Sequence, residues 1–81
     1  MKGKIIEILK EIRPEFSFNI DDNFIANGML DSFDIIALVV ALDKEFNISI
    51  DGMDILPENF SSVEKIESLL KKMLPNNEIG I

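Results

Sequence analysis

The sequence predicts a small all-α protein: a four-helix bundle made of three main helices and one short helix. Three segments repeat apolar residues at helical spacing, and they begin near residues 3, 32 and 61. A chain of 81 residues has room for one core, and its apolar fraction of 47% is enough to build that core. We therefore expect a single domain over residues 1–81, with its core at about 3–74 and a flexible tail at 75–81.

Residues 3–12 are the first predicted helix. Pro14 disfavours helical geometry at the residue before it and so ends the segment. Charged residues separate the apolar positions, which share one helical face and are Ile5, Ile8, Leu9 and Ile12.

Residues 14–31 show no sustained period and predict a long loop, and long ordered loops are often functional. Gly28 fits a turn that needs a positive φ. Five apolar side chains are expected to fix this loop to the core: Phe16, Phe18, Ile20, Phe24 and Ile25.

Residues 32–46 are the second predicted helix, although "IIALVVAL" is rich in β-branched residues and has the composition of a buried strand. Several of its residues are good helix formers, its pattern continues into "DKEF", and only "NISID" offers a partner strand, so a helix is favoured. Asp31 can cap this helix by accepting hydrogen bonds from free backbone N–H groups, with Asp34 three residues further on.

The second helix is apolar almost all round, and a small bundle cannot bury a helix on every side. Phe33, Ala37 and Val40 form one stripe at helical spacing, which predicts a docking surface. The alternative is a slightly rotated helix that buries Phe33 under the loop. Ile35 is expected to be partly exposed, and the residues expected to point inward are Ile36, Leu38, Val39, Leu42 and Phe46.

Residues 47–60 predict a connector with one short helical turn, in which Pro57 can take the first position. Ser61 and Glu64 then match the S-x-x-E capping box that opens a helix. Pro75 ends this third helix. Its inner face is expected to hold Val63, Ile66, Leu69, Leu70 and Met73.

Composition excludes several classes of function. The net charge of −7 and the pI near 4.3 argue against a nucleic acid partner and favour a basic protein surface. The chain has no histidine, no cysteine, no glycine-rich phosphate loop and no EF-hand, so we expect neither catalysis by this chain alone nor a metal site. The longest apolar run, residues 35–42, is far shorter than the roughly 20 residues of a membrane span, and the N-terminus is a poor signal peptide. From these features we expect a cytoplasmic monomer, and the start at Met1 and the short tail predict a discrete protein.

Ser32 stands between Asp31 and Phe33 at the start of the second helix, and it has two interpretations. In the first, Asp31 starts the helix and Ser32 is an exposed residue of its first turn without further consequence. In the second, the serine holds a phosphodiester, because the helix dipole and the free N–H groups favour an anion there.

Three stretches of the sequence resemble the acyl carrier protein and peptidyl carrier protein superfamily: "NGMLDSF", then "DIIALVVALDKEFNISI", then "ILPENFSSVEKIESLL". The resemblance covers residues 4–74 and implies a four-helix bundle with one short helix. It also implies that Ser32, between the acidic Asp31 and the hydrophobic Phe33, receives 4′-phosphopantetheine from coenzyme A. The thiol of that arm would carry acyl or aminoacyl groups as thioesters, in fatty acid or secondary metabolite biosynthesis. The implied partners are a phosphopantetheinyl transferase, acyl- or aminoacyl-activating enzymes, synthases and transferases.

The sequence departs from the fatty-acid carriers of that superfamily. They usually have leucine after the serine and glutamate five residues beyond it, whereas this chain has Phe33 and Ala37, with Lys44 where an acid is common. Docking is therefore expected to depend more on apolar contact, through Phe33, Asp34, Ala37, Val40 and Lys44. "LDSF" and "PENF" look closer to free-standing aminoacyl or specialised acyl carriers, including D-alanyl carriers. The alternative is a degenerate, unmodified homologue that binds a partner through Phe33, Ala37 and Val40.

Overall fold

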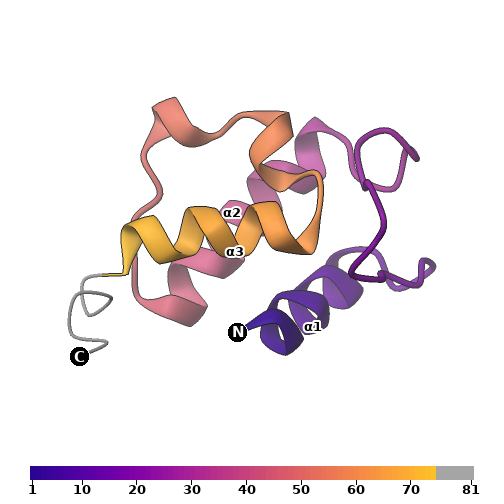
Figure 1. Cartoon of the computed structure of the whole chain (residues 1–81), viewed down its shortest axis with the longest axis horizontal. Coiled ribbons are helices and arrows are strands. Elements are labelled where there is room, and N and C mark those ends of the chain that lie inside the picture. The colour runs from indigo at the N-terminus through magenta and orange to yellow at the C-terminus, as the bar shows by residue number, and fades with distance from the viewer. Residues whose placement is uncertain (75–81) are drawn as a thin grey trace.

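The computed structural model describes residues 1–74, which contain three α-helices, two short 3₁₀ helices and no strand (Figure 1). The predicted all-α fold with three main helices is confirmed. In place of the one short helical turn that was predicted, the connector contains two. The elements in chain order are α1 (Lys2–Ile12), α2 (Ser32–Phe46), η1 (Gly52–Asp54), η2 (Pro57–Phe60) and α3 (Val63–Met73).

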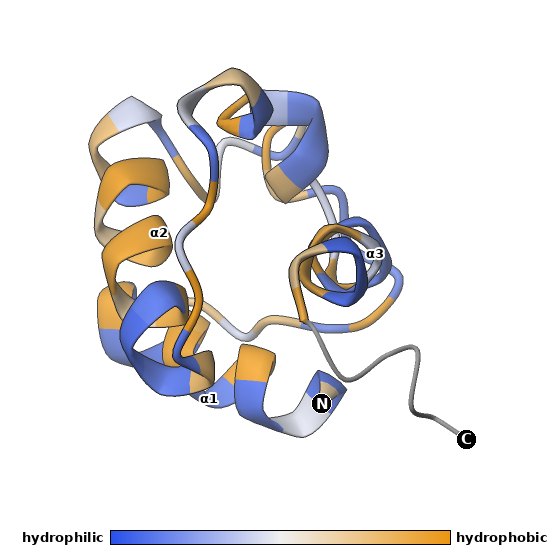
Figure 2. Ribbon diagram, turned by 90° about the vertical axis from the view of Figure 1, so that its left-hand side faces the viewer, coloured by the Kyte–Doolittle hydropathy of each residue, from blue (hydrophilic) through white to orange (hydrophobic). Residues whose placement is uncertain are grey.

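The three helices surround one apolar core. α1 contacts both α2 and α3 at one end of the bundle, and η2 contacts the same two helices at the other end (Figures 1 and 2). The side chains with no exposed surface come from all of these elements and from the loop between α1 and α2: Ile5, Leu9, Phe24, Leu38, Leu42, Phe60, Val63, Ile66 and Leu70. Within residues 1–74, no helix combines the length and the apolar character that crossing a bilayer requires.

The long loop between α1 and α2 is fixed by Phe24. Its ring is fully buried and lies edge-to-face against Phe18, with 5.2 Å between the ring centroids. Its backbone N–H donates to the carbonyl oxygen of Ser61, and its carbonyl oxygen accepts from the N–H groups of Met29 and Leu30 at 2.8 and 3.2 Å. Hence the chain is tightly anchored just before α2 begins.

Two predictions about this loop had different outcomes. Gly28 has a φ of 72°, as predicted. Ile20, expected to fix the loop to the core, is 44% exposed, so that prediction is wrong. The physical reason is a turn from Asn19 to Asp22, closed by a hydrogen bond from the Asp22 N–H to the Asn19 carbonyl oxygen, which places Ile20 at the surface.

α2 has the predicted bounds but a different rotation about its axis. Ile35 is 5% exposed and Ile36 is 55% exposed, the reverse of the prediction. The buried positions are spaced i, i+3, i+4 and i+7 from Ile35, which leaves Ile36 outside the buried face. Figure 2 shows that α2 is apolar around much of its circumference, whereas α3 divides into an apolar and a charged side. The buried side chains of α2 are Asp34, Ile35, Leu38, Val39 and Leu42.

The start of α3 lies one residue later than predicted. Ser62, not Ser61, is the N-cap, and its hydroxyl accepts from the Lys65 N–H at 3.1 Å. Ser61 closes η2, which begins with Pro57 as predicted, and the Ser61 hydroxyl donates to the Glu58 carbonyl oxygen at 2.9 Å. The predicted box of Ser61 and Glu64 is therefore wrong, because the 3₁₀ turn uses Ser61. The predicted inner face is buried apart from the half-buried Met73, and the predictions for Pro75 and the tail lie outside the described residues.

Candidate functional site

The sequence Asp31-Ser32-Phe33 lies where the anchored loop enters α2. Asp31 is the N-cap, and Ser32 is the first residue of the helix. The side chains of Ser32 and Phe33 are exposed, the latter by 85%. The alternative in which a rotated helix buries Phe33 under the loop is therefore excluded.

A capping box holds the backbone on both sides of Ser32. The Asp34 N–H donates to Asp31 Oδ1 at 3.0 Å, and the Asp31 N–H donates to Asp34 Oδ2 at 3.0 Å. The first of these bonds is the main reason that the pKa of Asp31 lies below its ordinary value, and the charge of Arg13 lowers this pKa further. Both aspartates are thus committed to the backbone of the turn.

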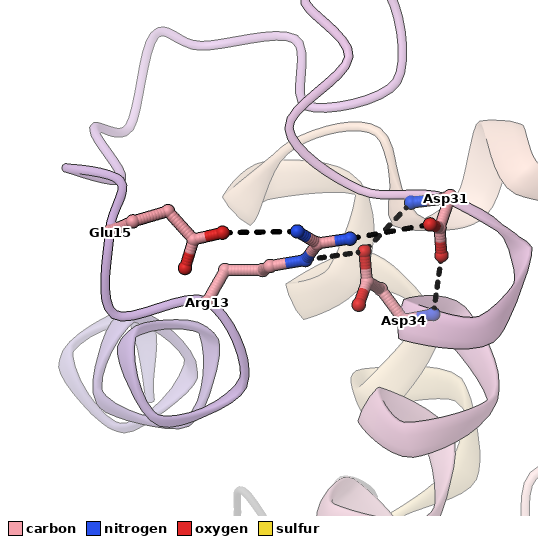
Figure 3. A network of polar contacts seen from close by, with 4 residues as sticks. All are labelled: Arg13, Glu15, Asp31 and Asp34. Carbon is pink, nitrogen blue, oxygen red and sulfur yellow. Dashed lines mark hydrogen bonds and ion pairs between the residues drawn. The ribbon is translucent and has the colours of Figure 1, made fainter.

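Arg13 joins this capping box from the end of α1 (Figure 3). Its Nε donates to Asp34 Oδ2 at 2.9 Å, and its Nη2 donates to Asp31 Oδ2 at 3.3 Å. Its Nη1 donates to Glu15 Oε2 at 3.0 Å, so that the guanidinium lies between Glu15 and the two aspartates. The bonds to Glu15 and Asp34 raise the pKa of Arg13. None of the hydrogen bonds in this network uses the Ser32 hydroxyl.

Sequence reasoning did not identify Arg13 as part of the site. Arg13 is 18 residues from Asp31 and 21 residues from Asp34, and no local period joins them. The prediction that placed Asp34 on the docking surface also does not fit the structure, since Asp34 is only 9% exposed. Its carboxylate points into the capping box because it is the partner of the Asp31 N–H.

An exposed apolar surface extends from Ser32 along α2. We call it the outer stripe and define it as Phe33, Ile36, Ala37 and Val40, all of which are exposed. Val40 is 62% exposed. Ile36 was missed as a member, although its spacing of three residues from Phe33 could have indicated it. Lys44, the last predicted docking residue, is exposed at the far end of α2 and lies beside Ile8 and Glu11 of α1.

A small surface pocket adjoins Ser32 between α2 and the 3₁₀ segment. Its volume is about 210 Å³, and its lining residues are Ser32, Ile35, Ile36, Ile55 and Pro57. Leu56, which lies between two of these lining residues in the chain, is 45% exposed and adds apolar surface. Among residues 1–74, no three acidic side chains are grouped so that they could hold a metal ion.

This geometry fits a covalently attached phosphate ester. The Ser32 hydroxyl is accessible and free of the hydrogen-bond network, and it lies in the first turn of a 15-residue helix, where backbone N–H groups favour an anion. The apolar pocket beside it is suited to contact with an attached organic arm. An exposed serine on a turn held by hydrogen bonds can serve as the attachment point of a prosthetic group.

The sequence of residues 2–70 matches the family described as "phosphopantetheine attachment site". The chain therefore belongs to this family, and its all-helical fold agrees with a phosphopantetheine carrier. The group that it carries is covalently attached 4′-phosphopantetheine.

Among similar proteins, a D-alanyl carrier protein from Leuconostoc mesenteroides is 35% identical over 75 residues, which cover 86% of this chain and 96% of the relative. An aminoacyl carrier protein 1 from Bradyrhizobium diazoefficiens is 29% identical over 91% of this chain and 86% of the relative. A D-alanyl carrier protein from Lactococcus lactis is 29% identical over 95% of this chain and all of the relative. No solved structure matches the chain significantly.

Proposed function

We propose that this protein carries an aminoacyl group, with D-alanine as the first candidate, as a thioester on a phosphopantetheine arm attached to Ser32. The observation that supports the attachment site is the exposed Ser32 hydroxyl, which takes no part in the hydrogen bonds that join the side chains of Arg13, Asp31 and Asp34. The names of the relatives, D-alanyl carrier and aminoacyl carrier, support the cargo. The arm supplies a terminal thiol that forms the thioester.

The residues of the turn present the serine but do not activate it. Asp31 is the nearest acidic side chain in the sequence, and its carboxylate already accepts from the Asp34 N–H and from Arg13. Its lowered pKa also makes it a weak base. The proton of Ser32 therefore passes to a base of the partner transferase, and this chain acts as a substrate of other enzymes rather than as an enzyme.

The outer stripe is the surface through which we propose that these enzymes dock. It begins at Phe33, next to Ser32, and extends to Val40, and none of its residues is charged. A partner with a complementary apolar surface would bury the stripe and so bring its active site to Ser32. The partners are a phosphopantetheinyl transferase, an amino-acid-activating enzyme and an acceptor transferase. The cytoplasmic location and the monomeric state remain predictions from the sequence.

Intact-protein mass spectrometry tests the attachment. The protein is incubated with coenzyme A and a permissive phosphopantetheinyl transferase, in parallel with Ser32→Ala and Ser62→Ala. Ser62 is the matched control, because it also begins a helix, and its hydroxyl has a structural role as the cap of α3. We expect a gain of one phosphopantetheine in the wild type and in Ser62→Ala and no gain in Ser32→Ala. A folded wild-type protein that gains no mass would support the unmodified partner-binding homologue instead.

The loaded protein then tests the cargo. Incubation with ATP, D-alanine and a D-alanine-activating enzyme should add one D-alanyl group. Hydroxylamine should then remove this group, because hydroxylamine cleaves thioesters. Activating enzymes for other amino acids and for fatty acids serve as the comparison. Loading by a fatty-acid-activating enzyme alone would contradict the aminoacyl cargo but leave the attachment at Ser32 intact.

A further inference from the structure

We propose that Arg13 is a positioning residue of the attachment turn: its guanidinium compensates the two aspartates beside Ser32, so that the turn tolerates a further negative charge on the serine. The inference rests on the proposed attachment at Ser32. Its basis is the network in Figure 3, in which one guanidinium contacts both carboxylates of the capping box.

The charges of the turn need compensation. A capping box of two aspartates brings two negative charges together, and like charges at this spacing repel each other. Among the residues that the structure describes, Arg13 is the one cation that forms an ion pair with either aspartate. Arg13, Glu15, Asp31 and Asp34 have formal charges of +1, −1, −1 and −1, which sum to −2, and a phosphodiester on Ser32 makes the sum −3.

The form of the guanidinium matters as well as its charge. Arg13 contacts Asp34 through Nε and Asp31 through Nη2, so one planar group bridges the two ends of the turn that holds Ser32. A lysine ammonium at this position would keep the charge but would lose the fixed fork of donors. Because the pKa of Arg13 is raised by its partners, the guanidinium remains charged throughout the working pH range.

A purely structural role is the competing explanation, since the same contacts also hold α1 to α2. Lys4 provides the control, because it joins α1 to Glu45 of α2 at 3.7 Å, at the other end of that helix from Ser32. A residue that only holds the helices together should affect the unmodified and the modified protein equally. A residue that compensates charge beside Ser32 should matter more once the phosphodiester is present.

The test compares the melting temperatures of the unmodified and the phosphopantetheine-loaded protein for the wild type, Arg13→Gln, Arg13→Lys and Lys4→Gln. We expect loading to lower the melting temperature more in Arg13→Gln than in the wild type, with Arg13→Lys in between. In Lys4→Gln, loading should have its wild-type effect. Equal effects of loading in Arg13→Gln and the wild type would overturn the proposal.

The loading reaction gives a second readout. With a permissive transferase, Arg13→Gln should lower kcat about fivefold, the size of one nearby unit charge in a mostly aqueous setting, and leave KM within about twofold. A loss found only in KM would mean that Arg13 contacts the transferase, which also contradicts the proposal. If the wild type itself is not loaded, the attachment proposal fails, and this outcome is distinct from a failure concerning Arg13.

Glu15→Gln keeps the test decisive if Arg13→Gln does not fold. Glu15 is exposed and contacts Arg13 from the side away from the aspartates, so its replacement removes one negative charge from the cluster. The proposal expects an effect opposite to that of Arg13→Gln: loading should lower the melting temperature of Glu15→Gln less than it lowers that of the wild type. An unchanged effect of loading in this variant would also contradict the role of Arg13.

Discussion

Ser32 and Ser62 both stand at the start of a helix, yet only Ser62 caps one. Ser62 accepts a hydrogen bond from the Lys65 N–H, whereas the cap of α2 is Asp31 and Ser32 is the residue after it. We expect Ser62→Ala to lower the free energy of unfolding by about 1 kcal/mol, or roughly 4–8 °C in melting temperature. Ser32→Ala should change it by less than about 0.5 kcal/mol. Thermal unfolding of the unmodified proteins measures both changes in stability. A large loss of stability in Ser32→Ala would assign the serine a structural role.

The backbone conformation of Gly28 can also be tested by substitution. Its φ of 72° lies in the left-handed region, and an added Cβ would meet nothing within 4 Å, so the backbone alone determines the cost of a substitution. We expect Gly28→Ala to lower the free energy of unfolding by about 1–2 kcal/mol. Gly52→Ala is the control, because Gly52 has similar free space without a positive φ. Urea denaturation of the two variants should therefore give different midpoints, and equal midpoints would contradict the backbone explanation.

At the scale of the element, α2 presents two adjacent valines to opposite environments. Val40 is 62% exposed in the outer stripe, and Val39 is 7% exposed in the core. We expect Val40→Glu to leave the melting temperature within about 2 °C. The same variant should raise the KM of the phosphopantetheinyl transferase about tenfold, because it places a charge in an apolar contact.

Val39→Glu is the matched control, with the same chemical change one residue earlier. An unpaired carboxylate in the core should cost about 3–5 kcal/mol and unfold a domain of this size. Circular dichroism and transferase kinetics on both variants measure the difference. A large loss of stability in Val40→Glu would show that the outer stripe is part of the core, and an unchanged KM in a stable Val40→Glu would remove it from the docking surface.

α1 and α3 were predictable from the sequence because each has a clear apolar period and a recognisable end, whereas α2 was predicted from its helix-forming residues and the lack of a partner strand. The errors arose where one residue decides the answer. In a helix that is apolar on most sides, a shift of one residue turns a side chain by about 100°, so the sequence pattern could not decide between Ile35 and Ile36. Likewise, of the two consecutive serines before α3, the motif predicted Ser61 as the cap, whereas Ser61 closes η2 and Ser62 caps the helix. The turn of Ser32 was predictable, but Arg13 was not, because its contacts depend on how α1 packs against α2.

At the scale of the whole molecule, two electrostatic effects oppose each other as the pH falls. Acidification from pH 7 towards the pI of 4.3 reduces the repulsion that accompanies a net charge of −7. The pKa values of Asp31 and Glu15 are lowered. The main cause is a hydrogen bond that each carboxylate accepts from a backbone N–H, from Asp34 for Asp31 and from its own residue for Glu15. The unfolded chain therefore binds protons first, and the stability from these groups is lost at low pH.

The ordinary pKa values fix the pH range of this loss. The contributions of Asp31 and Glu15 are fully present above 3.8 and 4.5 and disappear as the pH falls through their lowered values. We expect the melting temperature to change little between pH 7 and pH 5 and to fall below about pH 4. Asp31→Asn should make that fall shallower. Thermal melts over this range measure it, and a melting temperature that keeps rising below pH 4 would contradict the expectation.

The position of Ser32 next to Phe33 has a consequence for the order in which partner enzymes can bind this protein. A standard protein interface covers about 800 Å² on each partner. All enzymes that must reach Ser32 and also contact the outer stripe therefore bind to the same part of α2. On the proposed function, the enzyme that installs the arm, the one that charges it and the one that removes the cargo bind one at a time. Release from one enzyme then precedes every encounter with the next, and moderate affinities with fast dissociation would give the highest throughput.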